Sequence, residues 1–173
     1  YYPIAAVRRA VAARPRFVHE LVPVGLRAAN LVVERLHRRL GRVQGHKFAI
    51  GLRRVSDQEL DGVAIAARPV ARHLDDGLTA EVRRVAVDPA VVNGCTKLLG
   101  AIARSASAMG YRRLVTYTSE DEDGASLYAA GWDPIGRSPG GRCGSSKRPR
   151  DAGPEEGRKV VWVKVLRGDR RER

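Results

Sequence analysis

The sequence predicts an α+β fold in which one sheet carries helices on its faces. Seven short runs either alternate apolar with polar residues or are rich in β-formers, which is typical of strands. Two longer segments repeat apolar residues at steps of three and four, which is typical of amphipathic helices. At 173 residues the chain is long enough for one domain with a real core and too short for two.

The first half of the domain has the pattern of a strand, a helix and a hairpin. Leu21–Val24 is a short strand, and its proline indicates an edge position. An apolar stripe from Leu26 to Leu40 predicts an amphipathic helix that ends at Gly41. Residues 48–52 and 63–67 flank a polar turn and predict the hairpin.

The second half begins with a strand at 80–87, which Asp88-Pro89 stops. A long apolar stripe then predicts a helix from Asn93 to Gly110, and the β-formers at 113–118 predict a buried strand. The remaining elements are a short helix at 125–130, a strand that opens at Gly131 and a last strand at 160–165.

The net charge of +13 is concentrated at the two ends of the chain. Residues 1–47 carry +8 and residues 137–173 carry +7, whereas residues 48–136 carry −2. Basic ends suit a polyanionic partner such as DNA or tRNA, because each phosphate that is neutralised releases counterions. The alternative is a solvated surface in a protein that uses arginine throughout.

Composition along the chain predicts three parts, the second of which contains a long loop. We expect a basic appendage at 1–20, a folded domain at 21–166 and a charged tail at 167–173. Within the domain, residues 137–158 are rich in Gly, Ser, Pro and Arg without periodicity, which predicts a long basic loop.

The sequence also argues against several protein classes. No apolar run approaches the roughly 20 residues of a membrane helix, and the first residues carry no secretory signal pattern. Cys95 and Cys143 form no CxxC pair, and His19, His37 and His73 share no spacing, so we expect neither a disulfide scaffold nor a metal site. We expect a cytoplasmic protein without a membrane partner.

Three segments, in order along the chain, resemble the GNAT superfamily of acyl-CoA-dependent N-acyltransferases. Ala80–Pro89 resembles the family's fourth strand, the helix from Asn93 resembles the one that receives the coenzyme pyrophosphate, and Ala125–Trp132 resembles the LY-x-x-x-GF segment. The resemblance covers residues 22–166. It implies a mixed, mostly antiparallel sheet with helices on both faces and splayed fourth and fifth strands, and acetyl-CoA or another acyl-CoA as co-substrate.

Four shorter stretches resemble a divergent GNAT-like branch that is frequent in phages and mobile elements and lacks an assigned substrate. These stretches are Gln44–Phe48, Gly62–Ala64, Arg68–Arg72 and Thr116–Thr118. This narrower resemblance bears on the fold more than on any reaction.

The resemblance implies that the backbone of the fourth strand holds the pantetheine arm and that the next helix start holds the pyrophosphate. The residues concerned are Val85, Ala86, Val87, Asn93, Gly94, Cys95, Thr96 and Lys97. The family's loop reads roughly Arg/Gln-x-x-Gly-x-Gly/Ala, whereas here only Gly94 survives and the loop is about two residues shorter. Free N–H groups at a helix start still bind phosphate, and Thr96 and Lys97 add a hydroxyl and a charge.

Amide formation from a thioester needs a neutral amine, so a base must remove a proton. Glu81 matches the position of the base in some GNAT enzymes, and simple alternation would place it on one face with Arg83 and Val85. The alternative is a carboxylate that only pairs with Arg83. Tyr128 is the candidate acid for the leaving thiolate, one residue from the family's position, and Tyr117 is the second candidate.

Four residues are candidates to contact the substrate, and the resemblance implies that the basic loop borders the acceptor cleft, where its charge favours an acidic or phosphate-bearing acceptor. His46 and Lys47 open the second strand, Arg83 lies on the fourth, and Arg142 lies in the basic loop. A surface histidine beside a lysine also has a purely structural interpretation.

Three functions agree with these observations. The first is acetyl transfer from acetyl-CoA to an amine, which nucleic acid could carry. The second, by analogy alone, is a DNA-modifying GNAT-like protein of the Mom type. The third is a non-catalytic GNAT-like module that binds nucleic acid or a partner protein, which the shortened phosphate loop favours.

Overall fold

The computed structural model describes residues 17–37, 40–138 and 157–166. The predicted tail, most of the appendage and most of the basic loop, including Arg142, lie outside the described residues. None of the described helices is long and apolar enough to cross a bilayer.

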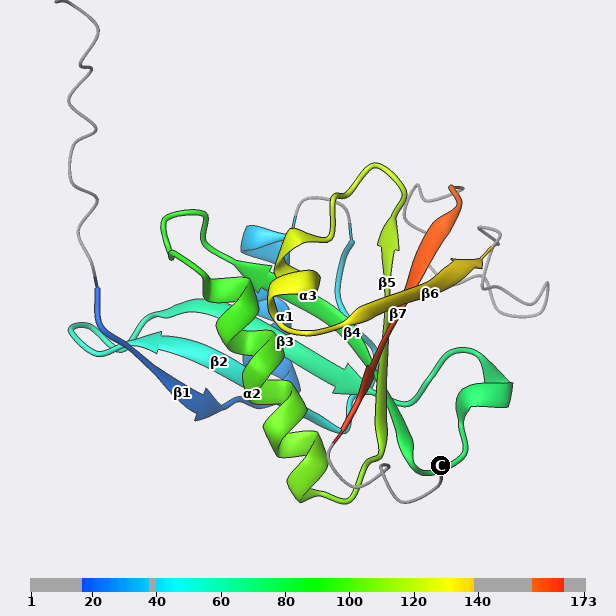
Figure 1. Ribbon diagram of the computed structural model, residues 1–173. Coiled ribbons are helices and arrows are strands. Elements are labelled where there is room, and N and C mark those ends of the chain that lie inside the picture. Colours follow the sequence, from blue (N-terminus) through cyan, green and yellow to red (C-terminus); the bar gives the residue numbers. More distant parts are fainter. Residues whose placement is uncertain (1–16, 38–39, 139–156, 167–173) are drawn as a thin grey trace, which may run out of the picture.

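The elements follow the predicted order of strands and helices (Figure 1). They are β1 (His19–Pro23), α1 (Leu26–Leu36), β2 (Phe48–Arg54), β3 (Leu60–Ala67), β4 (Thr79–Val87), α2 (Gly94–Ala108), β5 (Arg113–Ser119), α3 (Ala125–Ala129), β6 (Asp133–Ser138) and β7 (Lys159–Val165). A short 3-10 turn, Arg72–Leu74, lies in the expected loop before β4.

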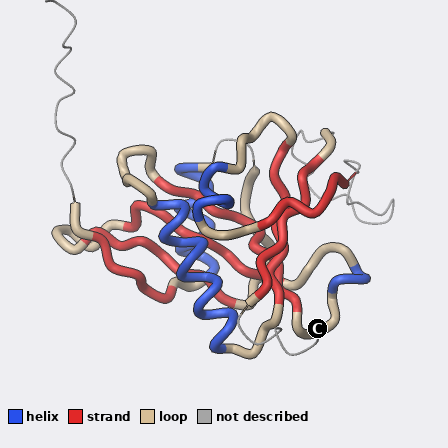
Figure 2. The backbone as a smooth tube through the Cα atoms, viewed as in Figure 1, coloured by secondary structure: helices blue, strands red, loops and turns tan. Residues whose placement is uncertain are grey.

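The strands form one sheet in the order β1-β2-β3-β4-β5-β7-β6. Every neighbouring pair is antiparallel except β4 and β5, which are parallel. Figure 2 shows the strands in red as a twisted sheet with helices in blue in front of it and behind it. The predicted α+β class with a mostly antiparallel sheet is therefore confirmed.

Two separate cores account for the helices on both faces. One core, which we call the α2-side core, packs α2 and α3 against the sheet and contains Leu98, Ile102 and both tryptophans. The other, the α1-side core, packs α1 against the opposite face and contains Val33 and Ile65. The small residues of β3 are buried on both faces because this strand lies between the two layers.

Helix α1 ends at Leu36, whereas the apolar stripe predicted that it would reach Leu40. The next residue, His37, has extended backbone angles. The buried side chain of Asn30 holds the returning chain, because its amide nitrogen donates to Val43 O and its oxygen accepts from Val43 N, both at 2.9 Å. This clamp turns the chain back over the helix, and the stripe does not reveal it.

A β-bulge on β4 overturns the expected alternation along that strand. Val82 and Arg84 pair with consecutive residues of β3, so Arg83 between them has no partner there. Val82 faces the α2-side core before the bulge, and Val85 packs against the same core after it. The expectation that Glu81 shares a face with Val85 is therefore wrong.

A buried carboxylate joins the first three strands. Asp61 on β3 accepts from His19 Nε2 at 2.7 Å and from Arg54 at 2.6 and 2.9 Å, and Arg54 also pairs with the exposed Asp57. The Arg54 guanidinium lies over the Phe17 ring. Burial opposes ionisation of Asp61, but the hydrogen bonds from Arg54 and His19 outweigh it and lower the pKa of this carboxyl.

We expect Asp61→Ala to lower the free energy of unfolding by about 3 kcal/mol, because it removes the shared carboxylate partner of the partly buried Arg54 and the buried His19 side chain. Asp57→Ala, which removes the exposed partner of Arg54, should cost less than about 1 kcal/mol. Folding lowers the pKa of Asp61, so its ionised carboxylate stabilises the folded protein at pH values above the ordinary pKa of an aspartate. This stabilisation is lost as the pH falls through the pKa that Asp61 has in the folded protein. Urea denaturation at neutral and acidic pH measures both effects; equal losses in the two variants would contradict the assignment.

Candidate functional site

The parallel contact between β4 and β5 is short. Only Thr79 to Glu81 pair with Arg113 to Val115. At the next position the Thr116 hydroxyl donates to Val82 O at 2.8 Å and closes the pairing. Beyond this point β4 continues beside β3 and β5 continues beside β7, so the two strands diverge.

A cavity of about 360 Å³ lies in this fork. Its walls come from the diverging halves of β4 and β5, from the first turns of α2, and from the segment that enters α3. Apolar side chains of Val82, Val85, Leu99 and Leu127 line part of it, and Ser126 contributes a hydroxyl.

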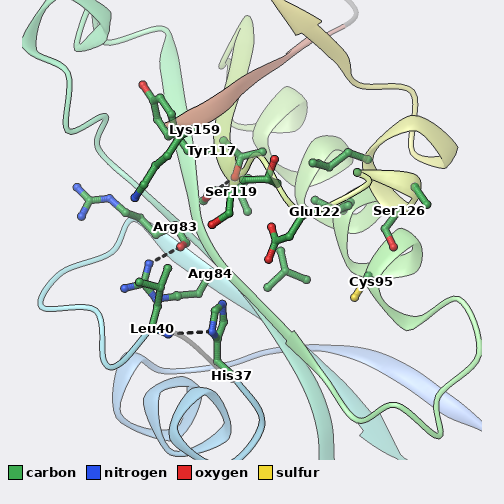
Figure 3. A pocket seen from close by; sticks show the side chains of 18 of the residues that line it. His37, Leu40, Arg83, Arg84, Cys95, Tyr117, Ser119, Glu122, Ser126 and Lys159 are labelled. Carbon is green, nitrogen blue, oxygen red and sulfur yellow. Dashed lines mark hydrogen bonds between the residues drawn. The ribbon is translucent and has the colours of Figure 1, made fainter. Parts of the chain in front are cut away.

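The cavity has one basic and one acidic side. In Figure 3, His37, Arg83, Arg84 and Lys159 lie on one side, and Glu122 reaches in from the other. An elongated ligand that spans the fork would therefore meet opposite charges at its two edges.

Arg84 is held at the edge of the cavity by backbone carbonyl groups. Its Nε donates to Gly41 O at 3.1 Å and one of its terminal nitrogens donates to Arg83 O at 2.7 Å. The bond to Gly41 attaches the loop after α1 to the bulge on β4.

His37 lines the cavity, although the sequence analysis gave it no role there. Its Nδ1 accepts the backbone N–H of Leu40 at 3.1 Å, so the neutral ring carries its proton on Nε2. The sequence gives little indication of this role, because a histidine near the end of an apolar stripe is common at the ends of helices. Its position in the cavity comes from the end of α1 at Leu36, which the apolar stripe does not predict.

The residues implied for coenzyme binding are not all brought together. Val85 and Cys95 line the cavity in the fork. Asn93 and Lys97 instead line a second hollow of about 320 Å³, which Asp61 and its partners border. Ala86 is buried in the α1-side core.

Gly94 is required by packing at the start of α2. A Cβ at this position would lie 2.4 Å from Cγ1 of Val87, which is closer than real side chains approach. The absence of a side chain here thus lets the helix pack on β4. Thr96 lines neither hollow.

Cys95 is the second residue of α2, and it is partly buried beside Ser126. Burial raises the pKa of its thiol more than the hydrogen bond with Ser126 lowers it. The side chain therefore stays a thiol at neutral pH.

Glu81 is buried and both of its carboxylate oxygens have contacts. One oxygen accepts the Val70 N–H at 2.7 Å, and the other lies 3.0 Å from Arg83 Nε. Burial raises the pKa of this carboxyl, although the Val70 N–H and the nearby arginines oppose the shift. Glu81 is not among the residues that line the fork cavity. Its contacts match the pairing alternative, and its role as a base stays a prediction.

The two candidate acids occupy different environments. Tyr117 lines the cavity from β5. Tyr128 is 57% exposed, does not line the cavity, and packs edge-on against the Trp162 ring with the ring centres 4.8 Å apart. Their catalytic roles stay predictions.

Three of the four residues predicted to bind substrate lie together. His46, Lys47 and Arg83 line a further cavity of about 500 Å³ beside the fork. The fourth, Arg142, is outside the described residues.

Trp162 holds the wall of the fork that leads into α3. Its Nε1 donates to the Thr118 hydroxyl at 2.8 Å, and its ring lies against Gly124. Gly124 has φ +65°, and a Cβ there would lie 2.3 Å from the Trp162 ring. Both the backbone angle and the ring therefore require glycine at this position.

We expect Gly124→Ala to destabilise the protein by about 2 kcal/mol or more, because it adds a steric clash to a strained backbone. Gly110→Ala is the matched control, since Gly110 also has positive φ but has nothing near its absent Cβ. Its cost should be about 1 kcal/mol. Thermal and urea unfolding compare the two variants; equal costs would show that the Trp162 contact is unimportant.

Comparisons with known proteins reveal the fold of this chain. No protein-family model matches the sequence, and no curated protein matches it either. Solved structures do match, among them the ribosomal-protein-S18-alanine N-acetyltransferase from Escherichia coli, with TM-score 0.61 and 15% identity over 86% of this chain and 94% of that one.

Two more matches have similar scores. A Bacillus subtilis acetyltransferase solved in complex with CoA has TM-score 0.57 and 14% identity, over 86% of this chain and 99% of that one. A mosquito arylalkylamine N-acetyltransferase-like protein has TM-score 0.62 and 12% identity, over 86% and 100%. The chain thus has the GNAT fold, with the parallel β4–β5 pair that opens into a fork.

Proposed function

We propose that this protein is an N-acyltransferase that uses acetyl-CoA or another acyl-CoA. The observation that carries the proposal is the fork, where the end of β4–β5 pairing leaves a cavity against the start of a long helix. Acetyltransferases of the same fold, one of them solved with CoA, support this interpretation.

The residues of the fork suit parts of such a coenzyme. Val82, Val85 and Leu99 offer apolar contacts to a pantetheine arm, and no strand of the described residues pairs with β4 on this side beyond Val82. The first N–H groups of α2, together with the Ser126 hydroxyl, suit phosphate oxygens at the far end. Since Asn93 and Lys97 line a different hollow, we assign the phosphate contacts to the Cys95 side of the helix start.

An acyl-CoA supplies a thioester carbonyl that a neutral amine can attack. We assign the base to Glu81, because burial raises its pKa toward the range in which a carboxylate removes protons from an ammonium group. We assign the acid to Tyr117 rather than Tyr128, since Tyr117 lines the cavity.

Calorimetry with acetyl-CoA tests the binding claim, and we expect micromolar affinity. Ser126→Trp should reduce that affinity at least tenfold by filling the cavity, which corresponds to about 1.4 kcal/mol. Ala129→Trp is the control, because Ala129 is exposed on the same helix and does not line the cavity. Absence of binding to the unaltered chain would instead support a non-catalytic module.

Thiol release from acetyl-CoA with a panel of amines tests the catalytic assignment. Glu81→Gln should lower turnover by about 100-fold or more and spare acetyl-CoA affinity, because it removes the base but keeps an oxygen for the Val70 N–H. In the unaltered enzyme the rate should rise with pH as the carboxyl ionises through its raised pKa. Unchanged turnover in the variant would leave Glu81 with a structural role.

A further inference from the structure

The cavity of about 500 Å³ beside the fork is strongly basic, and we name it the basic cavity. It lies between the loop before β2, the end of β3 and the bulge on β4. The charged and histidine side chains in its lining are Arg42, His46, Lys47, Arg68, Arg83 and Arg84. Its lining includes no acidic residue.

Five permanent positive charges therefore surround this space. Three of the arginines pair with carboxylates that lie outside the lining: Arg42 with Glu34, Arg68 with Asp75 and Arg83 with Glu81. Lys47 is exposed, and no carboxylate of the described residues pairs with it. The positive charges consequently exceed the negative ones around the cavity, which favours an anion.

The basic cavity is next to the fork. Arg83 and Arg84 line both spaces, because the bulge places two consecutive arginines at their boundary. The bonds from Arg84 to Gly41 O and Arg83 O keep its guanidinium there. A ligand with an anionic group in the basic cavity could thus extend an attached amine toward the fork.

We propose that the basic cavity binds a backbone phosphate of the nucleic acid that carries the acceptor amine. The excess of positive charge suits this ligand, because a charge-assisted hydrogen bond from the Lys47 ammonium to a phosphate oxygen is strong and the surrounding arginines add to the positive potential. The net charge of +13 attracts a polymer of phosphates more strongly than a single one. The acceptor role depends on the proposed acyl transfer, whereas phosphate binding in the basic cavity does not.

Fluorescence anisotropy with a labelled DNA duplex and the corresponding single strand tests this site without coenzyme. We expect Lys47→Glu to weaken binding at least tenfold and to make it less dependent on salt, because a phosphate contact is lost. The control is Arg112→Glu, which makes the same change of charge at an exposed residue that lines none of the three cavities. It should weaken binding less than threefold.

Equal losses in the two variants, or binding that is weak and independent of salt, would overturn the proposal. Competition experiments give a second test, in which unlabelled DNA, adenosine monophosphate and polyglutamate are compared at the same concentration of charges. If either of the last two displaces the labelled DNA as well as unlabelled DNA does, the site lacks preference for nucleic acid and the proposal is overturned. The affinity of the unaltered chain for acetyl-CoA is measured separately. Loss of that binding would count against the proposed acyl transfer and would leave phosphate binding in the basic cavity unaffected.

Discussion

The short parallel contact between β4 and β5 is the constraint on which the rest of the site depends. Beyond the first three pairs each strand keeps an antiparallel neighbour on its other side, so its backbone stays paired after the two strands separate. The Thr116 hydroxyl satisfies the last carbonyl before the strands separate. The fold thereby leaves a cavity at the centre of a continuous sheet without interrupting either half.

The bulge at Arg83 gives the fork its chemical character. One unpaired residue turns Val85 toward the α2-side core and leaves two successive arginines between the fork and the basic cavity. Glu81 precedes the bulge, in the regularly paired part of β4, and its carboxylate accepts the Val70 N–H. A single extra residue in the strand thus gives the fork an apolar side chain and a charged boundary.

Local patterns predicted nearly every strand and helix, because apolar periodicity records which face each element buries. They could not predict contacts made by single polar side chains across the fold. Helix α1 ends at Leu36, before the end of the apolar stripe, and the bulge reverses the alternation after Val82. His46, Lys47 and Arg83 were selected from sequence and lie together, whereas Tyr128 packs on Trp162 away from the cavity. A shift of one residue along a strand or helix changes the direction in which each side chain points. Such shifts depend on packing between distant segments, which local sequence patterns do not record.

A crystal structure of the chain grown with acetyl-CoA would show directly whether the fork binds the coenzyme. We expect electron density for the pantetheine arm in the fork between β4 and β5, with the phosphates at the start of α2 next to Ser126. Density for the coenzyme at another surface, or a fork that stays empty at saturating acetyl-CoA, would contradict it.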